Sequence, residues 1–230
     1  MRRSRRDSSA RKGGGAVRLH PLTILALAAA VMLLLAGWIA LRGEMVVAQS
    51  VARLQRQAVN LRSERPSPEP DPDLRPGKPP RALLADALFI AQQHVGASAP
   101  GRRQSLIAAD EAVADVTARR PHSADAWVIR ALLRSQLAGE GDASAIDALA
   151  RSYLEAPFLY RAAEWRVGYG ARQWGRLDAG SQTRLINEAL IYGQISGAAR
   201  LQMFAQIRDT DAYAPVLSAW HRLQLRRGLR

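Results

Sequence analysis

The feature that most constrains this chain is an uncharged apolar run at residues 21–41, PLTILALAAAVMLLLAGWIAL. As an α-helix these 21 residues reach roughly 30 Å, at about 1.5 Å per residue, which matches the hydrocarbon core of a bilayer. Ten of them are Leu, Ile or Val, which together favour insertion by roughly 3 to 6 kcal/mol. A helix that is apolar on every face needs lipid or a large core around it, and the flanking segments offer no such core. The run therefore predicts a transmembrane helix.

The basic residues before this run predict which way the helix crosses the membrane. Residues 1–20 form a Ser/Gly-rich tail with too little apolar surface to fold, so we expect disorder there. Residues 42–52 contain one cation, Arg42, and one anion, Glu44. Because cations accumulate on the cytoplasmic side, this asymmetry predicts an N-terminus inside and a C-terminus outside. The cations that set this topology are Arg2, Arg3, Arg5, Arg6, Arg11, Lys12 and Arg18.

A signal peptide is the alternative interpretation of the same run. Val46, Val47 and Ala48 form a small-residue site, and cleavage would follow Ala48. The apolar part of a signal peptide is typically about 7–15 residues long, and the run here is longer. The length therefore favours an uncleaved anchor.

The strong positive charge of the chain does not by itself point to nucleic acid. The formal net charge is +13 and the isoelectric point is near 11.3. The densest basic cluster lies in residues 1–20, where topology and anionic lipid headgroups account for it. The other basic residues are not interleaved with stacking aromatic side chains as in an RNA-binding sheet. We expect the lipid bilayer, and no nucleic acid, as a partner.

An amphipathic helix is expected to continue out of the membrane over residues 42–62, because no Gly or Pro falls between Glu44 and Arg65. Its apolar residues follow the a/d spacing of a heptad. One interpretation is a homodimeric coiled coil through residues 47–61. The other is a single helix that lies on lipid headgroups or against the next domain. The apolar stripe consists of Val47, Val51, Leu54, Ala58 and Leu61.

Residues 63–80 hold seven of the twelve prolines of the chain. Each proline fixes φ and biases the preceding residue towards extended backbone. The composition predicts a semi-rigid spacer of up to about 55 Å, at about 3.1 Å per residue. It also places a domain boundary before residue 81.

The remaining residues, 81–230, have a helical pattern throughout and predict an all-α domain. Ala, Leu and Arg are abundant, and runs of β-branched residues are few. Ser123 and Asp142 precede two of the helices and are expected to cap them. The expected helices are 81–95, 103–120, 123–138, 143–155, 159–173, 180–192, 196–207 and 212–227.

An internal repeat appears within this domain. Two segments share the form Ala-(x)11-Pro at a spacing of 36 residues, and a Trp opens the helix between them. This pattern resembles the tetratricopeptide (TPR) family, in which small residues let two helices approach and a Pro closes each unit. The resemblance covers about 81–157 and implies a superhelix of stacked helix pairs. The matching residues are Ala109, Val113, Pro121, Trp127, Ala131, Ala145, Leu149 and Pro157.

The sequence also departs from the family pattern. Arg130 and Arg134 occupy positions where the family has apolar or aromatic residues, and Ser152 replaces a small Ala. The spacing is two residues longer than the usual 34. Beyond residue 158 only the rhythm of helix pairs remains. An irregular helical bundle without stacked repeats is therefore the alternative fold.

Motifs for catalysis and metal binding are lacking in the sequence. There is no cysteine, and the four histidines, His20, His94, His122 and His221, are widely scattered. No HExxH motif, P-loop or G-x-S-x-G elbow is present. We expect no catalytic residue, no cofactor, no metal and no enzymatic activity.

Arginines fall among the aromatic residues that follow residue 157. A face that mixes Arg with Tyr and Trp could contact an acidic or sugar-rich partner, so Arg161, Arg166, Arg172 and Arg176 form a candidate partner surface. Residues 120–127 also resemble accessory proteins of polysaccharide assembly in the bacterial envelope. The resemblances imply a single-pass inner-membrane protein whose periplasmic domain is a scaffold for envelope proteins. Direct binding of an acidic polysaccharide is the alternative function.

Overall fold

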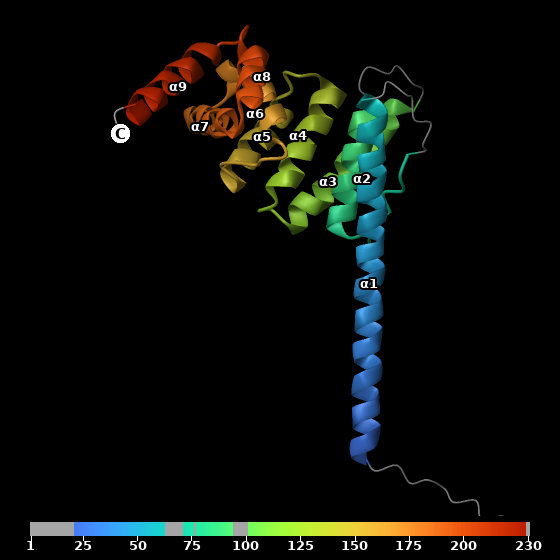
Figure 1. Cartoon of the computed structure of the whole chain (residues 1–230). Helices are drawn as coiled ribbons and strands as arrows, with labels where there is room; N and C mark the ends of the chain where they lie inside the picture. Colours follow the sequence, from blue (N-terminus) through green and yellow to red (C-terminus); the bar gives the residue numbers. More distant parts are fainter. Residues whose placement is uncertain (1–20, 63–70, 76, 94–100, 229–230) are drawn as a thin grey trace, which may run out of the picture. The chain divides into compact units, whose positions relative to one another are not determined.

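The computed structural model describes residues 21–62, 71–75, 77–93 and 101–228 (Figure 1). Within these residues the chain is all-α, with nine α-helices, one 3-10 helix and no strand. The predictions for the tail at residues 1–20, and for half of the Pro-rich segment, lie outside the described residues. The chain divides between Arg42 and Gly43 into two compact units.

Helix α1 (Pro21–Arg62) is continuous, as the sequence predicts. It contains one stretch, Ala29–Asn60, that is long and apolar enough to cross a membrane, with a mean hydropathy of 1.8. Among the side chains that the structure describes in the first unit, Leu33, Leu34 and Ile39 are 74%, 74% and 70% exposed. A soluble core helix would bury such side chains, so this part of α1 has the character expected of a lipid-facing helix.

The second unit begins at Gly43, well before the boundary predicted at residue 81. Its helices agree with the expected ones to within a few residues, except that the helix expected over 159–173 begins only at Ala163. The elements after α1 are α2 (Pro80–Gln93), α3 (Arg102–Arg119), α4 (Ala124–Ala138), α5 (Ala143–Glu155), α6 (Ala163–Arg172), the 3-10 helix η1 (Trp174–Arg176), α7 (Ala179–Ile195), α8 (Gly197–Ile207) and α9 (Tyr213–Gly228).

The second half of α1 packs against α2. Leu54 joins the apolar core of α2, α3 and α4. Arg53 Nη1 lies 3.4 Å from Oδ1 of Asp86, a fully buried carboxylate. With its amide oriented to satisfy both groups, the buried Gln57 donates to Phe89 C=O (3.3 Å) and accepts from Gln93 N–H (2.8 Å). Leu54 of the apolar stripe thus packs within the chain, whereas Val51 is 38% exposed, and a homodimer through 47–61 stays a prediction.

The described part of the Pro-rich segment is not a free spacer. Pro72 is buried, and Leu74 packs against two of the apolar clusters. Asp71 accepts a hydrogen bond from Ser105 Oγ on α3. Lys78 Nζ pairs with the buried Asp86 Oδ2 at 2.9 Å. These contacts explain why the compact unit extends upstream of residue 81.

Helices that follow each other in sequence pack against each other, from α2 to α5 and from α6 to α8. The predicted packing residues Ala109 and Val113 are fully buried in the cluster of α2, α3 and α4. Trp127 Nε1–H donates to Pro121 C=O at 2.7 Å. Pro121 and Pro157 themselves are exposed, each just past the end of a helix. The other predicted packing residues, Ala131, Ala145 and Leu149, are fully buried in the cluster formed from α4 onwards.

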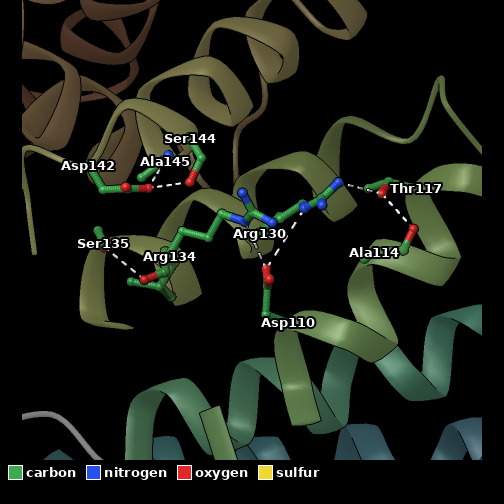
Figure 2. Close-up of polar contacts among 10 residues, drawn as sticks. Asp110, Ala114, Thr117, Arg130, Arg134, Ser135, Asp142, Ser144 and Ala145 are labelled. Carbon is green, nitrogen blue, oxygen red and sulfur yellow. Dashed lines mark hydrogen bonds and ion pairs between the residues drawn. The ribbon is translucent and has the colours of Figure 1, made fainter. Parts of the chain in front are cut away.

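The two arginines that depart from the TPR pattern are held by a carboxylate on the neighbouring helix (Figure 2). Arg134 Nε lies 3.3 Å and Arg130 Nε 3.8 Å from Asp110 Oδ1 on α3. Arg130 Nη1 also donates to Thr117 Oγ1 at 3.2 Å. Partial burial, and then the neighbouring Arg134, lower the pKa of Arg130. A polar triad thus joins α3 and α4 where the family pattern has apolar side chains.

Two glycines on α6 offer a matched test of the packing. A Cβ at Gly170 would lie 2.6 Å from Cδ1 of the fully buried Leu185, whereas one at Gly168 would meet only the side chain of the exposed Gln206. Alanine gains about 1 kcal/mol of helix propensity over glycine at either position. Overpacking costs about 1 to 3 kcal/mol where the neighbour cannot move.

We therefore expect Gly168→Ala to raise the free energy of unfolding by up to about 1 kcal/mol and Gly170→Ala to lower it by up to about 2 kcal/mol. Urea unfolding of the full chain in detergent micelles, followed by tryptophan fluorescence, measures both. Equal effects of the two substitutions would contradict the packing described here.

Candidate functional site

The second unit contains a groove of about 1080 Å³. Its walls come from α1 and from alternate helices of the unit, α2, α4 and α6, together with the segment 159–162 before α6. Its floor is mainly aliphatic and aromatic. The apolar residues that line it are Val47, Val51, Leu84, Ala85, Leu88, Ala91, Val128, Ile129, Leu132, Leu159, Ala162 and Trp165.

Charged and polar residues lie where the groove meets solvent. Arg81 and Asp125 come from the first turns of α2 and α4, and Arg161 precedes α6. All three are exposed. At the far ends of these helices, Arg172 forms a bidentate pair with Glu140, with Nε–Oε2 at 3.1 Å and Nη2–Oε1 at 3.2 Å.

Two stacked aromatic rings form part of the wall on α6. The ring centroids of Trp165 and Tyr169 are 4.9 Å apart, and the planes differ by 11°. Tyr169 Oη–H donates to Glu140 C=O at 2.8 Å. Burial, followed by the nearby Glu140 and Asp142 carboxylates, raises the pKa of Tyr169 to about 12. This side chain therefore stays neutral at physiological pH and acts as a fixed hydrogen-bond donor.

A fully buried ion pair lies behind the segment 156–162. Arg166 Nε on α6 is 3.1 Å from Glu188 Oε2 on α7, and both side chains are 0% exposed. The pair also binds the backbone of the segment, because Arg166 Nη2 donates to Ala156 C=O at 2.9 Å and Leu159 N–H donates to Glu188 Oε1 at 3.0 Å. Leu159 lines the groove, so the buried ion pair fixes the backbone of one groove wall from the protein interior. These bonds also explain why α6 begins later than the sequence predicts.

The arginine of this pair stacks on a buried tyrosine. Its Cζ is 4.1 Å from the ring centroid of Tyr153 on α5, and Tyr153 Oη–H donates to Arg166 C=O at 3.2 Å. Burial raises the pKa of Glu188 to about 7, although Arg166, the Leu159 amide and Tyr153 act in the opposite direction. Burial also raises the pKa of Tyr153. The geometry at Arg166 Nε is that of an ion pair rather than an aligned hydrogen bond.

The predicted partner surface is only partly present. Arg161 and Arg172 line the groove, as a partner surface requires. Arg166 does not belong to it, because its guanidinium is buried and paired with Glu188. Arg176 is exposed but donates to Gly141 C=O at 2.5 Å and does not line the groove.

The residues that sequence reasoning missed come mostly from α2 and α4. Leu84, Leu88 and Leu132 belong to ordinary helical apolar patterns, and nothing local marks them as groove residues rather than core. The heptad stripe did single out Val47 and Val51, but for a dimer rather than for a groove. Residues of alternate helices form a groove only through tertiary packing, so the sequence of one helix cannot predict it.

The side chains of the groove suit non-covalent recognition, since they combine an apolar floor with separate cations and amides. Among the described residues, no group of three or more His, Cys, Asp or Glu side chains could hold a metal ion. No family model, curated protein or solved structure matches this chain in the comparisons made.

Proposed function

We propose that this chain is a membrane-anchored adaptor that binds a segment of a partner protein in the groove of its helical unit. The observation that carries the proposal is the groove itself, with about 1080 Å³ between α1, α2, α4 and α6. That volume is at or above the upper end of typical small-ligand pockets, about 300–1,000 Å³. Its length along several helices suits a peptide or a helix better than a small metabolite.

The composition of the groove supports a protein partner. Exposed apolar side chains such as Val51 (38%) stand beside nearly buried ones such as Val128 (8%), so a bound segment would cover apolar area that water now contacts. Amphipathic helices bind grooves of this type by placing their apolar face inward. Arrays of stacked helix pairs, to which the TPR resemblance points, use concave surfaces in the same way.

The anchor is the first half of α1. Its uncharged stretch at residues 21–41 is long enough to span a bilayer, and the cations of residues 1–20 favour a cytoplasmic N-terminus. The groove would then face the opposite side, which is the periplasm if the chain is a bacterial inner-membrane protein. A reporter fused after Arg230 tests this topology: activity of a periplasm-dependent reporter supports it, and activity only of a cytosol-dependent reporter contradicts it.

A role in envelope polysaccharide assembly rests on the resemblance of residues 120–127 alone. The alternative function is direct binding of an acidic polysaccharide. Arg166 is buried and cannot contribute to such binding, whereas Arg161 is an exposed cation at the groove. Protein binding uses the apolar floor, which a polysaccharide would leave largely uncovered. The groove therefore favours the adaptor function.

The groove makes a specific prediction for peptide binding. Peptides selected by display against the full chain in detergent micelles should be amphipathic, with apolar residues at helical spacing. Val51→Asp places a carboxylate in the groove, which should weaken their binding by about tenfold or more. Fluorescence anisotropy with a labelled peptide measures the dissociation constant.

The matched control is Val59→Asp, which makes the same change on the same helix at a side chain that is 61% exposed and does not line the groove. It should leave the dissociation constant within about twofold. Selection of no peptide above the background of an empty micelle would refute the adaptor function. Retention of an acidic polysaccharide by a chain that selects no peptide would support the alternative.

A further inference from the structure

The two ends of the groove carry different chemistry, which allows an inference that rests on the proposed function. Short connections, such as residues 120–123 and 139–142, join neighbouring helices, which makes these neighbours antiparallel. Alternate helices therefore run in the same direction. The N-terminal ends of α2, α4 and α6 consequently lie at one edge of the groove, and their C-terminal ends lie at the other.

The first edge is cationic. It carries Arg81 and Arg161, for which the described residues provide no ion pair or side-chain hydrogen bond, against one carboxylate, Asp125. The N-terminal ends of three helices add partial positive charge at the same edge. Cations therefore outnumber carboxylates at this edge.

The second edge is charge-balanced, and its two glutamine oxygens are covered by the protein itself. Gln136 Nε2 donates to Ala91 C=O at 3.1 Å, which fixes the amide so that its Oε1 is the free atom. That oxygen and Oε1 of Gln92 are buried without a donor among the described residues, and both side chains line the groove. The charges here cancel, because Arg172 is paired with Glu140. This edge therefore lacks the excess of cations found at the first edge.

We propose that the groove takes an amphipathic helix of the partner protein that runs antiparallel to α2, α4 and α6, with acidic side chains in its last turn. The first turn of any α-helix carries partial positive charge, which suits the charge-balanced second edge better than the cationic first edge. The last turn has free C=O groups and partial negative charge, which match Arg81 and Arg161. A parallel helix would place its partially positive first turn against these cations.

The dimensions set the length of the bound helix. From Arg81 to Gln92 on α2 the groove extends about 16 Å, at about 1.5 Å per residue. A helix of about eleven residues covers that distance. An amphipathic peptide of 14 residues, with one extra turn, is therefore a suitable probe.

Three synthetic versions of such a peptide test the proposal. The first has two Glu in its last turn, the second has Gln at those positions, and the third moves the two Glu to its first turn. We expect the first to bind the full chain in micelles about three- to tenfold more tightly than the other two. Fluorescence anisotropy at low and high salt gives the three dissociation constants, and salt should reduce the difference.

The variant Arg81→Gln together with Arg161→Gln should abolish the preference for the first peptide while leaving binding of the Gln peptide within about twofold. The control, Arg103→Gln together with Arg208→Gln, removes two exposed cations that do not line the groove and should keep the preference. Equal binding of all three peptides, or a preference that survives loss of Arg81 and Arg161, would overturn the orientation but not the adaptor function. Failure of every peptide to bind would overturn both.

Discussion

Glu188→Ala should lower the free energy of unfolding of the second unit by about 3 to 5 kcal/mol at pH 8, where the carboxylate is ionised. The substitution leaves the Arg166 guanidinium buried at 0% exposure with no counter-charge. It also removes the acceptor of the Leu159 N–H. Alanine also leaves a cavity beside the guanidinium, whereas the protonated Glu188 that burial favours below pH 7 still fills the site and still accepts from Leu159 N–H, so the substitution costs more than protonation does. Urea unfolding of the full chain in detergent micelles, followed by tryptophan fluorescence, measures the loss.

Two further variants separate the charge from the packing. Glu111→Ala, at an exposed position on α3, should change the free energy of unfolding by less than about 0.5 kcal/mol. Replacing both partners, Arg166→Met with Glu188→Leu, should recover much of the loss, since no buried charge is left behind. A loss below about 1 kcal/mol for Glu188→Ala would show that the pair does not hold the segment 156–162 as described.

The local sequence was sufficient to predict the positions of most helices to within a few residues. Asp142 precedes α5 and, as the sequence predicts, caps it by accepting a hydrogen bond from Ala145 N–H at 2.9 Å. Ser123 stands at the same position before α4, but its hydroxyl makes no capping bond. Helix ends depend on residues within one turn, so composition and spacing indicate them well. The all-α class follows from the same local signals.

Contacts between distant residues could not be predicted in this way. Arg166 looks like a surface arginine in sequence, because the carboxylate that neutralises it lies on another helix, at Glu188. Leu74 lies in the Pro-rich segment, which predicts a spacer, yet its side chain packs against two apolar clusters of the helical unit. Asp86 resembles a solvated residue of an amphipathic helix until Arg53 and Lys78 are placed around it. In each case the sequence shows the side chain but not the partner that decides its environment.

The same holds for the groove, and for a general reason. Its floor consists of residues that satisfy the ordinary pattern of a helix packed on its neighbours. Whether such a residue contacts another helix or an open groove depends on how far apart alternate helices stand, and that spacing is a tertiary property. Arg161 and Arg172 were accessible to sequence reasoning because they lie among aromatic residues, but the same pattern also selected Arg166, which is buried.

Between about pH 4.5 and pH 7 the stability of the second unit should fall as the pH rises, by on the order of 3 kcal/mol in total. Burial raises the pKa of Glu188 from 4.5 to about 7, so in this range the folded chain binds more protons at this site than the unfolded chain. A raised pKa gives stability that is fully present below pH 4.5 and lost as the pH passes through 7. Glu188→Gln cannot titrate, so the difference in urea midpoint between wild type and this variant isolates the effect. A difference that stays constant from pH 4.5 to 7.5 would mean that Arg166 keeps the carboxylate ionised in the folded chain throughout, and that its charge outweighs the loss of water around Glu188.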